Sequence, residues 1–384
     1  MPRPFRSLLV PTTLLAALSL PALAQETRHE SFPFQPGQRL EAKLERGDIE
    51  YRTGSGSTLA VTISVDKGKI ADVVEVRFVP GATGLQIEAE ALGDGAAGVL
   101  SWLFGGGGDS HSGLRFVLEG PARADLALST SGGDVRIGDV EGKVALASSG
   151  GNVEFGTVTG ELTAATSGGD VGGRTVSGPA TLATSGGNIQ IETGGENLKM
   201  RTSGGDITVG AGEGPIDVAT SGGNIKVGDS SSDVSASTSG GDVEVGRVSG
   251  ALKVATSGGN VRIAQAGGDG NVTTSGGDIS IAEAAGRLKA FSSGGNLVVT
   301  LAEGNDAGGT IGTSGGLLTV RIPPGLGLEI NADANGGRVT STLAFSASAT
   351  EAKDRLVATL AGGGNLLTLR NDDGDIRIEA AGSR

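Results

Sequence analysis

The residues with the clearest capacity for chemistry are carboxylates and amides that follow a repeated Ser-Gly-Gly tripeptide. Ten copies of the tripeptide recur with a constant 18-residue period, and another begins at Ser314 after a slightly longer step. Asp and Asn alternate strictly after Gly-Gly, and such a column of side-chain oxygens could bind calcium. The ten tripeptides begin at Ser131, Ser149, Ser167, Ser185, Ser203, Ser221, Ser239, Ser257, Ser275 and Ser293, and the residues that follow them are Asp134, Asn152, Asp170, Asn188, Asp206, Asn224, Asp242, Asn260, Asp278 and Asn296.

Two interpretations of this column compete. In the first, the column is a stack of tight turns in which Gly adopts a positive φ, while Ser and Asp or Asn close side-chain-to-backbone hydrogen bonds. In the second, the column binds calcium as nonapeptide β-rolls do. Such rolls need several oxygen ligands for each ion, whereas each unit here offers at most one Asp and lacks a third glycine. The sequence favours the structural turn and predicts no metal site.

Residues that could carry catalysis are few. The chain has no cysteine and two histidines, His29 and His111, and neither histidine lies near a nucleophile motif. The lack of Cys excludes disulfides, thiolate metal sites, thiol nucleophiles and iron–sulfur clusters. The sequence contains no nucleophile elbow, phosphate loop or dinucleotide fingerprint followed by a helix. We therefore predict no catalytic residue, no cofactor-binding residue, no cofactor and no enzymatic activity.

One enzymatic alternative is a parallel β-helix that cleaves acidic polysaccharides. Such enzymes generally build their clefts from side loops on irregular coils, and the units here leave little from which to build a cleft. The outward positions after the turns are mixed and polar and contain no aromatic ladder for stacking sugar rings, which counts against a carbohydrate groove. These outward residues are Arg136, Glu154, Gln190, Thr208, Lys226, Glu244, Arg262 and Ser280.

Each repeat unit must position its turn with two short strands. Apolar residues alternate with polar ones before the turn, as at Leu126 and Leu128, and again after it, as at Val135 and Ile137. A period of two with β-branched residues and Gly-rich turns predicts strands. One pair of such strands buries little, but stacked units form a continuous core. The sequence therefore predicts an all-β, right-handed parallel β-helix or β-solenoid, in which 34 of the 70 glycines lie in turns or directly after a strand.

The number of residues in each coil is either 18 or 36. With 18, every Asp would lie between two Asn, so carboxylates would be about 9.6 Å apart instead of about 4.8 Å. Asn amides could then bridge the carboxylates. With 36, Asp would stack directly on Asp, which is costly without a cation. Electrostatics favours 18, although the alternation could also reflect duplication of a two-unit ancestor.

The chain divides into four predicted segments. Residues 1–24 read as a secretory signal peptide, with Arg3 and Arg6 before an apolar run and a cleavage site at Ala22-Leu23-Ala24. Residues 25–125 carry no 18-residue repeat and are expected to form a small β cap. Residues 126–322 form the regular solenoid, and residues 323–384 form irregular last coils and a C-terminal cap. No later segment is apolar for long enough to span a membrane as a helix.

A Gly-rich segment interrupts the predicted N-terminal cap. It runs from Gly93 to Gly113 and contains the only tryptophan, Trp102, close to Phe104. One interpretation is a long hairpin loop whose apolar cluster folds back on the body. The other is an exposed aromatic patch that contacts a partner or a membrane.

The motifs resemble those of a bacterial family of exported β-strand-repeat proteins that carries an adhesin label and a domain of unknown function. The resemblance lies in the Thr-Ser-Gly-Gly-Asp-Val repeats, the Leu126-to-Ile137 entry, the strand end Val320-Arg-Ile-Pro-Pro-Gly325 and the closing Leu369-to-Ile378 segment, and it covers about residues 30 to 380. It implies an exported parallel β-solenoid. The family brings no catalytic residues to transfer to this chain.

Together these observations predict a non-enzymatic exported protein, adhesin-like or structural in the cell envelope, that presents flat repetitive β faces for binding. The alternatives are a periplasmic scaffold without an adhesion role and a polysaccharide-active β-helix. The net charge of −13 argues against nucleic acid as a partner. Expected partners are an envelope or extracellular protein or polymer, and end-to-end self-association stays open. The expected location is the periplasm, the cell surface or the medium.

Overall fold

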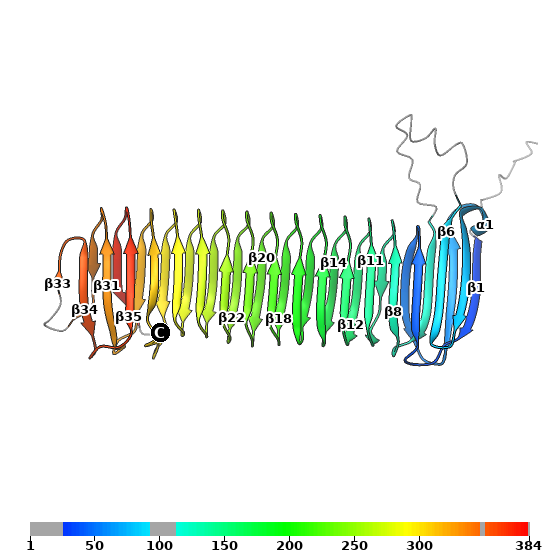
Figure 1. The fold of residues 1–384 in the computed structure, drawn as a ribbon, viewed down its shortest axis with the longest axis horizontal. Helices are drawn as coiled ribbons and strands as arrows, with labels where there is room; N and C mark the ends of the chain where they lie inside the picture. The colour runs from blue at the N-terminus through cyan, green and yellow to red at the C-terminus, as the bar shows by residue number, and fades with distance from the viewer. Residues whose placement is uncertain (1–25, 93–112, 346–349, 383–384) are drawn as a thin grey trace, which may run out of the picture.

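The chain forms an elongated rod built from two β-sheets that face each other across a narrow core (Figure 1). The computed structural model describes residues 26–92, 113–345 and 350–382. The predicted signal peptide, Trp102 and His111 lie outside the described residues. Within the described part, no helix is long and apolar enough to cross a membrane.

One sheet, called sheet B, contains the strands that precede the Ser-Gly-Gly turns. Its pairings run from one free edge to another, so the sheet is open. In spatial order its strands are β5 (Val74–Gly81), β6 (Gly84–Ala91), β2 (Arg39–Leu44), β8 (Asp125–Thr130), β11 (Val144–Ser148), β13 (Leu162–Ala165), β15 (Pro179–Ala183), β17 (Asn197–Arg201), β19 (Ile216–Ala219), β21 (Val234–Ser237), β23 (Leu252–Ala255), β25 (Gly270–Thr274), β27 (Leu288–Ser292), β29 (Gly309–Thr313), β35 (Leu366–Asn371), β31 (Leu328–Ala334), β34 (Arg355–Leu360) and β33 (Thr350–Glu351).

The opposite sheet, called sheet A, contains the strands that follow the turns. In spatial order these are β1 (Glu26–Pro33), β4 (Thr58–Val65), β7 (Arg115–Pro121), β3 (Asp48–Gly54), β9 (Val135–Ile137) with the short β10 (Val140–Glu141), β12 (Val153–Thr159), β14 (Val171–Val176), β16 (Ile189–Gly194), β18 (Ile207–Gly212), β20 (Ile225–Ser230), β22 (Val243–Val248), β24 (Val261–Ala266), β26 (Ile279–Ala284), β28 (Leu297–Leu301), β30 (Leu318–Ile322), β36 (Ile376–Ala380) and β32 (Val339–Ser341). One short helix, α1 (Ile70–Val73), lies beside β5.

The strand register shows that one repeat unit makes one coil. Leu126 of β8 lies opposite Val144 of β11, which lies opposite Leu162 of β13, and the pairing is parallel. In sheet A, Val135 pairs with Val153, the equivalent residue of the next unit. The predicted all-β solenoid is confirmed, and of its two proposed coil lengths the structure has the shorter.

Stacking in this register places like residues on like in the core. The inward side chains of the strands are buried and are mostly Val, Ile, Leu or Ala, and exposed or half-buried outward side chains alternate with them. At one position of this ladder a side chain is missing, and a ring from the neighbouring coil fills the space. Gly173 of β14 has no side chain, and a Cβ there would lie 2.0 Å from Cε2 of Phe155, so the Phe155 ring of the neighbouring coil occupies that space.

The N-terminal end contains one full coil of the solenoid in addition to capping strands. Strands β2 and β3 form a full coil that lies between β6/β7 on one side and β8/β9 on the other, all in parallel pairing. Beyond this coil, β1, β4 and β5 pair antiparallel and close the end. The sequence analysis assigned no coil to residues 25–125, because a single coil far from its neighbours in sequence has no detectable period.

The C-terminal end has the same design. Strands β35 and β36, last in the chain, lie between β29/β30 and β31/β32. The rod then ends with β34, which pairs antiparallel to β31. At both ends, therefore, a coil is enclosed by strands that are not its neighbours in sequence (Figure 1).

Candidate functional site

The Ser-Gly-Gly column is explained in full by hydrogen bonds between coils. The residue before each Ser-Gly-Gly is a buried Thr or Ser. Thr220 Oγ1 donates to the carbonyl oxygen of Gly205 in the preceding coil at 2.9 Å, and the N–H of Gly223 donates to the same Oγ1 at 3.3 Å. One buried hydroxyl thus satisfies a donor and an acceptor of the backbone in most of these turns.

The alternating Asp and Asn residues form a second ladder. The backbone N–H of Asp206 donates to Oδ1 of Asn188 at 2.8 Å, and that of Asn224 donates to Oδ1 of Asp206 at 2.7 Å. The role needs an oxygen, so Asp and Asn serve equally. Nδ2 of Asn224 also donates to Oδ1 of Asp206 at 3.3 Å, while Oδ1 of Asn224 accepts from the backbone N–H of Asp242, so the amide contacts one carboxylate and does not bridge two. Among the described residues, no group of three or more His, Cys, Asp or Glu side chains could hold a metal ion.

The glycines of these turns are needed for a reason that the sequence analysis missed. A positive φ was expected, but Gly133 and Gly151 do not adopt one. A Cβ at Gly151 would instead lie 2.2 Å from the carbonyl oxygen of Gly133 in the preceding coil. The turns stack so closely that only glycine fits at the second Gly.

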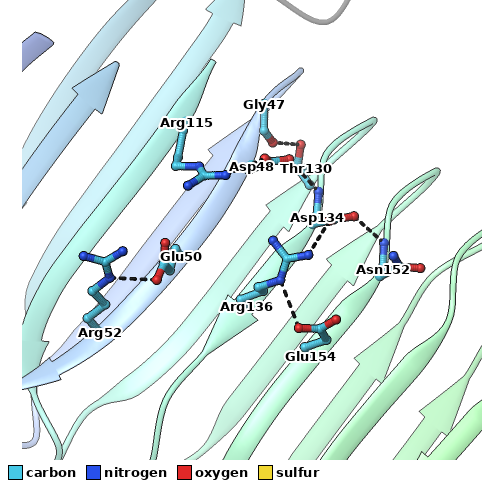
Figure 2. Close-up of polar contacts among 10 residues, drawn as sticks. All are labelled: Gly47, Asp48, Glu50, Arg52, Arg115, Thr130, Asp134, Arg136, Asn152 and Glu154. Atoms are coloured by element: carbon cyan, nitrogen blue, oxygen red, sulfur yellow. Dashed lines mark hydrogen bonds and ion pairs between the residues drawn. The ribbon is translucent and has the colours of Figure 1, made fainter. Parts of the chain in front are cut away.

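At the N-terminal end of the column the alternation fails, because two Asp residues stack directly. Asp48 of β3 lies next to Asp134, whose N–H donates to Asp48 Oδ1 at 2.9 Å. Arginines compensate for the adjacent carboxylates: Arg115 lies 3.8 Å from Asp48, and Arg136 lies 2.7 Å from Asp134 (Figure 2). The structure thus supplies the cations that stacked carboxylates require.

The same arginines belong to a charged cluster on the outer face of sheet A. Arg136 also pairs with Glu154 at 2.9 Å, and Arg52 pairs with Glu50 at 2.7 Å (Figure 2). The hydrogen bond from Arg52 holds the pKa of the Glu50 carboxyl below its ordinary value, and the one to Glu154 raises the pKa of Arg136. The hollow between these pairs measures about 580 Å³. Its arginines already have carboxylate partners, so we interpret the cluster as ion pairs that stabilise the first coils.

A different hollow lies on the outer face of sheet B. This groove, hereafter the sheet B groove, crosses strands β19 to β27 and measures about 660 Å³. Its lining includes three exposed cations, Lys253, Arg287 and Lys289. The sequence analysis weighed only the outward residues after the turns and missed this face. The available signal was Lys253 and Lys289, which occupy the same position of two repeat units with one unit between them.

The histidines contribute no site in the described residues. His29 lies on the exposed edge strand β1, where its Nδ1 is 3.0 Å from Oγ1 of Thr62. Tyr51 is the one buried tyrosine; its hydroxyl donates to the carbonyl oxygen of Pro121 at 2.7 Å, and burial raises its pKa. Both contacts join strands of the N-terminal end.

Comparison with known proteins confirms the family resemblance. Residues 207–379 match the Toastrack DUF4097 family. No curated protein matches the chain. Similar solved structures include a candidate cell adhesion protein from Clostridium sporogenes (10% identity, TM-score 0.19, covering 93% of this chain and 100% of that one) and a candidate adhesin from Bacteroides fragilis (11%, 0.34, 63% and 98%). Another is a candidate adhesin from Parabacteroides distasonis (13%, 0.20, 77% and 97%). Similarity at this level carries no argument about activity.

Proposed function

We propose that this chain is an exported, non-enzymatic β-solenoid of the cell envelope, which presents its long outer faces for binding in an adhesin-like or structural role. The observation that carries the proposal is the uniform 18-residue register, which repeats through the regular coils without side loops. Outward side chains therefore stand in straight columns about 4.8 Å apart. Such a surface suits an extended partner better than a small substrate, which needs an enclosed cleft.

Export is supported by the N-terminal sequence and the acidic composition. Residues 1–24 have the charged, apolar and small-residue parts of a secretory signal. A cysteine-free chain folds equally well in oxidising compartments, and here stability comes from stacked backbone and core. The adhesin names of the similar solved structures agree with this role but say nothing of a ligand.

Localisation by fractionation, combined with protease treatment of intact cells, tests the proposal. We expect the processed protein in the envelope or medium and, for an adhesin-like role, cleavage by external protease. A processed protein confined to the periplasm and protected from protease would favour the scaffold alternative. An unprocessed cytoplasmic protein would contradict the proposal.

A further inference from the structure

We propose that the sheet B groove binds a linear acidic polysaccharide. The inference rests on the proposed function, because it names the partner class of one outer face. It is carried by three cations without carboxylate partners and one exposed aromatic ring, all on three neighbouring coils of the same face.

The groove exists because small residues interrupt a face of longer side chains. Ser235 of β21 and Ala251, which directly precedes β23, are the small side chains along it. It runs across the strands and therefore along the rod. Its direction suits a polymer that lies parallel to the rod axis.

The cations of the groove differ from those of the preceding coils. Between residues 126 and 248, six of the seven Lys and Arg side chains form ion pairs, Lys199 being the exception. Between residues 249 and 300, none of the four forms an ion pair among the described residues. Three of these four, Lys253, Arg287 and Lys289, line the sheet B groove. They remain available for the anionic groups of a ligand.

Phe291 extends this face by an apolar ring. It is 44% exposed and is the one large exposed hydrophobic residue of the described coils between 126 and 322. It follows Lys289 on β27 with one residue between them, so both side chains point outward. A Cβ at Gly312 of the next coil would lie 3.6 Å from Cδ2 of Phe291, so the ring extends over a position without a side chain. The ring covers the buried Gly312, and its exposed part offers a surface on which a sugar ring can stack.

The spacing and sign of the charges favour an acidic glycan over a denser polyanion. Lys253 and Lys289 lie two coils apart, about 9.6 Å, which is close to the length of one disaccharide. Asn271 stands between them, and Asp233 and Asp269 at the rim can accept hydrogen bonds from sugar hydroxyls. Nucleic acid, with a phosphate every few ångströms, carries more negative charge per unit length than cations about 9.6 Å apart can neutralise, whereas a glycan with one carboxylate per disaccharide matches their spacing.

The test measures binding of hyaluronan, which carries one carboxylate per disaccharide, to the full processed chain at low salt. We expect binding that weakens as salt is added. The triple variant K253A/R287A/K289A should lose about tenfold in affinity or more, equivalent to about 1.4 kcal/mol. F291A should also weaken binding, and because this substitution removes no charge, the loss in affinity should change little with salt concentration. The matched control R262A removes the fourth unpaired cation, which lies on sheet A in the same part of the rod, and should bind like wild type.

Dextran and double-stranded DNA serve as the neutral and dense-anion probes, and circular dichroism checks that each variant is folded. The inference is overturned if wild type does not bind hyaluronan, if the triple variant binds as well as wild type, or if DNA binds as tightly. It is also overturned if R262A loses as much as the triple variant. If hyaluronan binding fails, the proposed envelope location is unaffected. An unprocessed cytoplasmic protein would contradict the proposed function even if hyaluronan bound.

Discussion

The buried hydroxyl before each Ser-Gly-Gly turn shows how one atom stabilises a whole coil. Thr220 Oγ1 accepts one backbone hydrogen bond and donates another across the coil boundary. Ser148 and Ser292 fill the same position elsewhere with the same pair of bonds. The hydroxyl therefore matters more than the methyl group.

We expect Thr220→Val to lower the free energy of unfolding by about 1–3 kcal/mol, because it leaves a buried carbonyl and N–H unpaired. Thr220→Ser is the matched control and should cost clearly less. Denaturant unfolding of the purified chain measures both. Equal losses for the two variants would show that the hydroxyl has no special role.

The alternation of Asp and Asn separates like charges by two coils. Asn224→Asp keeps the oxygen acceptor but places three carboxylates in consecutive coils, at 206, 224 and 242. We expect this variant to unfold at a lower temperature in dilute buffer and to recover toward wild type at high salt, since salt screens exposed charges. Asp206→Asn, which retains the oxygen, is the control. A loss in Asn224→Asp that salt does not reduce would contradict the electrostatic explanation.

One side-chain oxygen of each residue in this column, Oδ1, already accepts a backbone N–H, and no unit supplies the several further oxygens that calcium needs. Calcium or a chelator should therefore leave the melting temperature of the protein unchanged. A rise with calcium that the chelator reverses would support the β-roll interpretation instead.

At the scale of elements, the strands fit each other as ladders of matched volume. Phe155 of β12 and Gly173 of β14 are a large and a small residue at positions where other coils have Ile or Val. A Phe alone would overfill the core at this level and a Gly alone would leave a cavity, whereas the two together fill the same volume as the regular pair.

Gly173→Val should destabilise the fold by about 1–3 kcal/mol through overpacking against the Phe155 ring. Phe155→Val should also destabilise it, because it leaves a cavity. The double variant F155V/G173V should be more stable than the sum of the single effects predicts, since it recreates the regular ladder. Additive effects in the unfolding measurements would mean that the two residues are not coupled.

At the scale of the whole molecule, both ends of the rod depend on coils inserted between strands distant in sequence. Strand β31 has two partners, β35 on one side and the antiparallel β34 on the other. Asn371 of β35 stands in the column of buried Thr residues, next to Thr313, and donates from Nδ2 to the carbonyl oxygen of Gly316 at 2.7 Å. The end of the chain therefore joins the regular coils to their terminal strands.

A variant that ends at Gly364 should lose more than the coil it lacks. Strands β35 and β36 pair with β29 and β30 of the regular coils, and β35 also pairs with β31. Without them, β31 loses its parallel partner and its connection to the regular coils. We expect amide hydrogens of β31 to exchange rapidly in the variant while those of β18 and β20 stay protected. Deletion of residues 26–33, which removes only the edge strand β1, is the comparison and should leave β2 and β3 protected. Retained protection of β31 would show that it docks without the inserted coil.

The regular part of this protein was determined by its sequence alone. A period of 18 between Ser-Gly-Gly turns and a period of two within strands fixed the core residues, the turns and the solenoid, because each unit repeats the local geometry of its neighbours. Tertiary structure decided the rest. The coils at 39–54 and 366–380 occur once and pair with strands far along the chain, so no local pattern reveals their place. The pairing of Asp48 with Asp134, and the convergence of Lys253, Arg287, Lys289 and Phe291 on one face, depend on which coils stack together. That stacking is a long-range property which the spacing of residues within one unit does not contain.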